Sequence, residues 1–168
     1  GLERVGLTLL DSAVLLARQA DSTMSPPDIV ARLAQTVDAR LRERVPFRPG
    51  AESLLAELGA LGVPMALVTM SYGSQVELVL AALPQGTFAA VVTGEDVVDG
   101  KSHPEPYLRG LSLLGVAGRA GECVALEDSP TGTASAVAAG IPTLVTPAVV
   151  AVPPGPGYTV IPGLAGVR

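Results

Sequence analysis

An α/β fold built on a doubly wound parallel sheet is the architecture that three features of this 168-residue chain predict. Short, continuously apolar runs recur from residue 64 onward, and such runs are typical of strands buried on both faces. Segments with helical periodicity separate these runs, as in alternating strand and helix units. Aromatic residues make up only 3% of the chain and Trp is absent, so Leu, Val, Ala and Ile must build the core.

The predicted elements alternate regularly along the chain. We expect strands at 64–69, 89–93, 122–127 and 142–146. The intervening helices are expected at 73–83, 104–115 and 131–139, after a helix that starts at Ala51-Glu52. The tail 152–163 is rich in Pro and Gly, and we expect it to be loop-like and only partly regular.

Two further helices are predicted before a domain boundary near Phe47. Residues 7–20 place apolar side chains at helical spacing. Ser25, followed by two prolines, is a start signal for a second helix with apolar residues at four-residue steps. We therefore expect residues 1–46 to form a small helical subdomain and residues 47–168 to form the α/β core.

Composition and charge exclude several classes of function. The net charge is -5, and no cluster of basic residues offers a footprint for nucleic acid. Prolines interrupt the most apolar stretch before it reaches the length that spans a membrane. Cys123 is the only cysteine, which rules out an internal disulfide and fits a reducing cytoplasm. We expect a small-molecule partner and a monomer or weak homodimer.

Glu127 and Asp128 are adjacent carboxylates where a predicted strand ends and a helix begins. Two such acids repel each other, and a divalent cation relieves the repulsion. Hard oxygen ligands suit Mg²⁺. The alternative is a helix N-terminus, where acids are favoured by capping and by the helix dipole.

Lys101 is the only lysine of the chain, because the other ten basic residues are all arginine. It lies in a loop with Gly100 and Pro104, directly before a predicted helix. A compact ammonium in a chain that otherwise uses arginine suggests contact with a phosphoryl oxygen. An exposed loop lysine without such a role is the alternative.

Thr69 ends the first predicted strand and is followed by Ser71 and Gly73. Its hydroxyl and the nearby backbone N–H groups could converge on an anion. The alternative is that Thr69 caps the next helix.

In combination, these segments resemble the haloacid dehalogenase superfamily. The order is Thr69 at a strand end, then Gly100-Lys101 with Pro104, then Glu127-Asp128-Ser129, and finally Gly140-Ile141-Pro142 after an alanine-rich helix. The resemblance covers nearly the whole chain. It is to the branch with a helical cap, which contains phosphoglycolate phosphatase-like and β-phosphoglucomutase-like enzymes, and it implies a Rossmann-like core.

The resemblance implies a role for each matching residue. Thr69 would hydrogen-bond the transferring phosphoryl group, with Ser71 as an added contact, and Lys101 would neutralise its charge. Glu127 and Asp128 would hold Mg²⁺. Arg4 resembles a cap arginine that contacts substrate phosphate. Physically, a metal ion, an ammonium and oriented donors would stabilise the transition state of phosphoryl transfer.

The nucleophile of that family is an aspartate in an Asp-x-Asp-x-Thr motif on the central strand, and no Asp-x-Asp occurs before Thr69. The nearest candidate is Asp11, but Ala13 stands in the place of the second acid. We therefore expect the nucleophile and the first strand upstream, with residues 1–46 as the later helices of the cap. The chain alone is expected to be inactive, and the neighbours of the missing strand are expected to expose unpaired backbone.

Three functions remain open on this basis. A phosphatase for a small phosphorylated metabolite is favoured, a sugar-phosphate mutase is the nearest variant, and a non-catalytic binding module comes from a different class. Two positions depart from the family pattern, since Ser102 replaces a frequent proline and Met70 a frequent asparagine. His103 is expected to be a loop residue.

Overall fold

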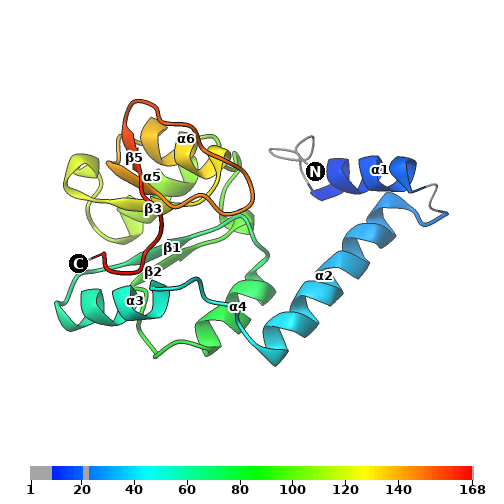
Figure 1. Cartoon of the computed structure of the whole chain (residues 1–168), viewed down its shortest axis with the longest axis horizontal. Coiled ribbons are helices and arrows are strands. Elements are labelled where there is room, and N and C mark those ends of the chain that lie inside the picture. Colours follow the sequence, from blue (N-terminus) through cyan, green and yellow to red (C-terminus); the bar gives the residue numbers. More distant parts are fainter. Residues whose placement is uncertain (1–8, 21–22, 168) are drawn as a thin grey trace. The chain divides into compact units, whose positions relative to one another are not determined.

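The computed structural model describes residues 9–20 and 23–167 of the chain, which divides into two compact units at residues 46 and 47 (Figure 1). The first unit contains α1 (Leu9–Gln19) and α2 (Pro26–Glu43), which pack against each other. The hydroxyl oxygen of Ser25 accepts a hydrogen bond from the backbone N–H of Asp28 at 3.3 Å. The start signal in the sequence therefore does cap α2.

The second unit alternates helices and strands, and its two ladders of parallel strands confirm the predicted α/β class. Its elements are α3 (Ala51–Ala60), β1 (Ala66–Val68), α4 (Gly73–Ala81), β2 (Ala90–Val92), η2 (Gly94–Asp96), α5 (Glu105–Leu113), η3 (Ala120–Glu122), β3 (Ala125–Glu127), α6 (Pro130–Ala138), β4 (Thr143–Val145) and β5 (Tyr158–Val160). None of the described helices is both long and apolar enough to cross a membrane.

The strands form two separate parallel ladders. β1 pairs with β2, and β3 pairs with β4, which in turn pairs with β5. Among the described residues no ladder joins β1 to β3. One edge of each of these two strands therefore carries backbone groups without a strand partner, as expected from the sequence.

The tail contains a strand that the sequence analysis missed. The tail is only partly regular, as expected, but its strand β5 was not identified; β5 adds to the edge of β4 with Thr143 opposite Tyr158. Gly157 precedes it with a φ of +84°, a conformation that glycine adopts at little cost. Residues 158–160 form a strand because they pair with the open edge of β4. The surrounding prolines and glycines are typical of loops, so the sequence alone does not indicate this strand.

The core lies between the strands and two helices. α5 packs on β1 and β2, α6 packs on β3 and β4, and the two helices contact each other. Figure 1 shows α3 and α4 on the other side of β1 and β2. In β3, Ala125 and Glu127 are buried whereas Leu126 is 43% exposed. The expectation that every strand is buried on both faces is therefore wrong for β3, since its described neighbours cover one face only.

Candidate active site

The predicted site residues follow the carboxyl ends of two strands from different ladders. Thr69 follows β1, and Asp128 follows β3. The ammonium of Lys101 joins these two places. It donates to the carbonyl oxygen of Val68 at 3.0 Å and to Oε1 of Glu127 at 2.5 Å. The structure thus brings the lysine, the end of β1 and the first member of the acidic pair together.

The carboxylate of Glu127 is buried and surrounded by donors. Oε1 accepts from Lys101 and from the Tyr107 hydroxyl, each at 2.5 Å. Oε2 accepts from the Asp128 backbone N–H at 3.2 Å and from the Ser129 hydroxyl at 3.4 Å. The Lys101 ammonium therefore offsets part of the buried negative charge of Glu127.

Tyr107 is a site residue that the sequence analysis did not identify. It lies in the first turn of α5, is 8% exposed, and has its ring centroid 5.1 Å from Nζ of Lys101. Burial, and next the negative charge of Glu127, raise the pKa of Tyr107 far above its usual value, so the phenol stays protonated. The sequence feature that could have identified Tyr107 is an aromatic residue six positions after Lys101 in a chain with few aromatics.

The two acids of the pair differ in exposure. Asp128 is exposed, and its carbonyl oxygen accepts from the Ala148 backbone N–H at 3.3 Å. The N-cap of α6 is Ser129, whose hydroxyl oxygen accepts from the Gly132 N–H at 3.0 Å. Ser129, and neither member of the acidic pair, therefore caps this helix, and the Asp128 carboxylate is exposed directly before the helix start.

Thr69 and Ser71 form a tight turn after β1. The Thr69 backbone N–H donates to the Val92 carbonyl oxygen at 2.9 Å, and Oγ1 accepts from the Ser71 N–H at 3.1 Å. The Thr69 hydroxyl also donates to Oγ of Ser71 at 3.2 Å. The N-cap of α4 is Tyr72, so Thr69 does not cap that helix. Two hydroxyl groups thus gather beside the carbonyl that Lys101 contacts.

The Lys101 loop is held by contacts from three directions. Its backbone N–H donates to Sδ of Met70 at 3.4 Å, so the residue that departs from the family pattern touches the lysine directly. The hydroxyl of Ser135, which is fully buried in α6, donates to the carbonyl oxygen of His103 at 2.5 Å. Nδ1 of His103 accepts from the Glu105 N–H at 3.3 Å, which fits the expected role as a loop residue.

Asp99, His103 and Glu105 form a second acidic group in this loop, with ligand-type atoms within 4.8 Å of one another. Both oxygens of Glu105 accept backbone N–H bonds at 2.9 Å, from Val98 and from Asp99. These two bonds lower the pKa of Glu105. Glu105 therefore supports the backbone of the loop, and this group is distinct from the acidic pair after β3.

The donor set after β3 fits Mg²⁺ in chemistry. Asp128 offers an exposed carboxylate, and Glu127 offers Oε2, whose two contacts are longer than those of Oε1. Both are hard oxygen donors of the kind this cation prefers. Arg4 lies outside the described residues. Asp11 lies within α1, a helix, so it does not match a nucleophile carried on a strand.

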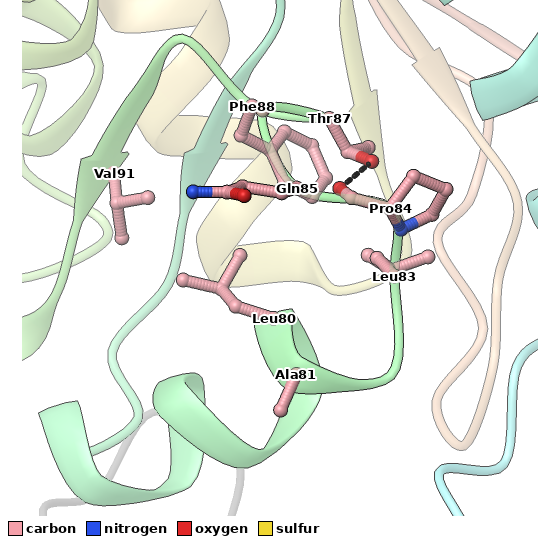
Figure 2. Close-up of a pocket in the computed structure, with 9 residues that line it drawn as sticks. Leu80, Ala81, Leu83, Pro84, Gln85, Thr87, Phe88 and Val91 are labelled. Carbon is pink, nitrogen blue, oxygen red and sulfur yellow. Dashed lines mark hydrogen bonds between the residues drawn. The ribbon is translucent and has the colours of Figure 1, made fainter.

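A groove lies away from these residues. It has a volume of about 470 Å³ and is lined by the end of α4 and the segment before β2. Figure 2 shows Leu80, Phe88 and Val91 around it and the Thr87 hydroxyl bonded to the Pro84 carbonyl oxygen at 2.7 Å. This groove lies at the amino end of β2, and none of the predicted site residues lines it.

The chain is similar to several known proteins. A family profile described as haloacid dehalogenase-like hydrolase matches residues 10–140. Protein CbbY, plasmid, of Cupriavidus necator is 40% identical over 107 residues, which is 61% of this chain and 41% of that protein. Hexitol phosphatase A of Escherichia coli is 36% identical over 132 residues, 76% of this chain and 59% of that protein. The chain thus spans about half the length of these relatives.

A solved structure shares the fold. The crystal structure of a mutant CbbY from Rhodobacter sphaeroides, in complex with xylulose-(1,5)bisphosphate, superposes with a TM-score of 0.75 at 26% identity. The match covers 86% of this chain and 67% of that protein.

Proposed function

Because the chain belongs to the haloacid dehalogenase-like hydrolases, we propose that it forms the phosphate-handling part of a Mg²⁺-dependent phosphatase for a small phosphorylated metabolite. The observation that carries the proposal is the Lys101 ammonium, which is bonded both to Glu127 and to the carbonyl at the end of β1. An ammonium has three donors. Described residues use two of them, so the third serves a phosphoryl oxygen.

The other site residues have complementary roles in this proposal. The hydroxyls of Thr69 and Ser71 donate to the same phosphoryl group, and Asp128 holds Mg²⁺ with Glu127 beside it. Bound Mg²⁺ supplies positive charge to the phosphoryl oxygens. Lys101 adds charge from a part-buried position, where electrostatic interactions are stronger than in water. Arg4 stays a proposed phosphate contact.

The nucleophile that the family resemblance implies is an aspartate on a strand, which forms an aspartyl-phosphate that water then hydrolyses. β1 and β3 belong to separate ladders, which supports a strand between them that would carry this aspartate. Its carboxyl end would face Lys101. Under this proposal residues 1–46 are part of a helical cap, and the 168-residue chain alone does not turn over.

The relatives support a sugar phosphate or polyol phosphate as the substrate class. One is named as a hexitol phosphatase, and the CbbY structure contains a ketose bisphosphate. A sugar-phosphate mutase or a binding module without catalysis would use the same lysine and acids, so turnover distinguishes them.

The test compares release of inorganic phosphate by the full-length protein and by the 168-residue chain. Substrates are an aryl phosphate and a panel of hexitol and pentulose phosphates, with Mg²⁺ or with a chelator. We expect Mg²⁺-dependent release by the full-length protein only, and its loss in Asp128→Asn but not in Glu77→Gln, an exposed control on α4. Phosphate transfer between sugar positions without net release would favour the mutase, and binding without either reaction would favour the binding module.

A further inference from the structure

We propose that Tyr107 is a positioning residue of the site, which fixes Glu127 through its hydroxyl and Lys101 through its ring. The hydroxyl lies 2.5 Å from Oε1 of Glu127, and the ring centroid lies 5.1 Å from Nζ of Lys101. One side chain thus contacts both members of the ion pair. The inference rests on the proposed function, in which Lys101 contacts the phosphoryl group.

The hydroxyl determines which oxygen of Glu127 serves the lysine. Tyr107 and Lys101 both donate to Oε1, and the two donors to Oε2 are longer at 3.2 and 3.4 Å. The Tyr107 hydroxyl donates to Oε1, and both atoms are buried. The Tyr107 bond therefore resists rotation of the carboxyl group and keeps Oε1 under the ammonium.

The ring limits where the ammonium can go. An ammonium within about 6 Å of an aromatic centroid is attracted to the ring face. Tyr107 is itself fixed, because it is buried with Leu111 and Ala125 in the core on which α5 packs. Lys101 is therefore held by Glu127, by the Val68 carbonyl oxygen and by an immobile ring, so its remaining donor has a defined direction.

The single lysine of the chain makes this arrangement directly observable. Lysine labelled with ¹³C and ¹⁵N gives side-chain NMR signals from Lys101 alone. In the wild-type chain we expect an Overhauser contact between the Lys101 ε-methylene protons and a tyrosine ring, and slow exchange of the ammonium protons. This measurement uses the 168-residue chain and requires no turnover.

Tyr107→Phe keeps the ring and removes the hydroxyl, whereas Tyr158→Phe removes a hydroxyl that donates to the Pro153 carbonyl oxygen at 2.5 Å in the tail. We expect Tyr107→Phe to quicken ammonium exchange about ten-fold, as for a lost hydrogen bond to a charged group, while Tyr158→Phe leaves the Lys101 signals unchanged. In the full-length protein, kcat/KM for the aryl phosphate should fall by a similar factor only in Tyr107→Phe.

Lys101 signals in Tyr107→Phe that superimpose on those of the wild type would overturn the inference, as would equal shifts in both variants. If Tyr107→Phe does not fold, the test is the Overhauser contact between Lys101 and a tyrosine ring in the wild type. Absence of that contact would overturn the inference. Failure of the proposed function has a different signature. In that case the full-length wild type would not release phosphate with Mg²⁺, although the lysine signals would still depend on Tyr107.

Discussion

Lys101 and Glu127 form an ion pair at 2.5 Å across 26 residues of sequence, with side chains that are only 13% and 5% exposed. Burial of two charges is favourable only when each has a close partner and further hydrogen bonds. The pair has these bonds from Val68 and Tyr107. It therefore ties the loop before α5 to the end of β3, and loss of either charge affects folding as well as the site.

Lys101→Met should lower the free energy of unfolding by about 3 kcal/mol, because it leaves the carboxylate of Glu127 buried without its cation. Urea unfolding followed by circular dichroism measures this. Lys101→Met combined with Glu127→Gln should recover much of the loss, since neither charge is then left alone. Strictly additive effects of the two substitutions would show that the pair is not coupled.

Gly132→Ala should disrupt the same pair from the side of α6. A Cβ at Gly132 would overlap the carboxylate of Glu127, whereas one at Gly59, within α3, would meet nothing within 4 Å. Gly132→Ala should cost about 1–3 kcal/mol of stability through overpacking. Gly59→Ala, the same chemical change, should stabilise by about 0.5–1 kcal/mol because it favours the helix. Equal effects of the two would contradict this explanation.

The sequence predicts most of the fold, because apolar runs mark the strands and helices and Gly and Pro mark the turns between them. The parallel α/β class follows from them, as does the start of α2 at Ser25. β5 could not be found in this way, because its pairing depends on the open edge of β4. The exposure of Leu126 was missed for a related reason, since local hydrophobicity does not reveal which face of a strand is covered.

The sequence draws attention to the charged residues of the candidate site but not to the side chains that contact them. Lys101 and the acidic pair carry charge at unusual places, which a sequence displays. The contacts of Tyr107 and Met70 with the lysine depend on side-chain packing between distant segments. The bond from Lys101 to Glu127 likewise joins segments 26 residues apart, and local sequence does not reveal it.

The Lys101 loop should become less stable in acid through Glu105. The N–H bonds from Val98 and Asp99 lower the pKa of Glu105 below its ordinary value of 4.5. Between the two pKa values the folded state binds fewer protons than the unfolded state. The stabilisation by Glu105 is therefore full above pH 4.5 and is lost as the pH falls through the lower pKa of the folded state. Glu105→Gln should flatten the pH dependence of unfolding below pH 4.5, with Glu77→Gln as an exposed control. Identical acid profiles for the wild type and Glu105→Gln would contradict the assignment.

Arg48 should control the backbone beside the acidic pair without touching either carboxylate. Its guanidinium donates to the Thr146 carbonyl oxygen at 2.5 Å, to the Thr146 hydroxyl oxygen at 3.0 Å and to the Pro147 carbonyl oxygen at 3.2 Å. The Thr146 N–H in turn donates to the Glu127 carbonyl oxygen at 2.7 Å. A planar guanidinium reaches the two carbonyls from separate nitrogens in a fixed fork, whereas a lysine ammonium presents its donors from one nitrogen on a flexible stem.

Arg48→Lys should therefore cost about 1 kcal/mol of stability and quicken amide hydrogen exchange at Thr146 and Ala148, whose N–H groups bond the carbonyls of the acidic pair. Arg109→Lys, an exposed change on α5, is the matched control and should leave both amides unchanged. If exchange at Thr146 and Ala148 rises equally in both variants, the effect is general loosening of the core. A rise confined to Arg48→Lys means that Arg48 holds the loop after β4 against the backbone of Glu127 and Asp128. Movement of the segment that carries Arg48 would then shift the backbone of the proposed metal ligands.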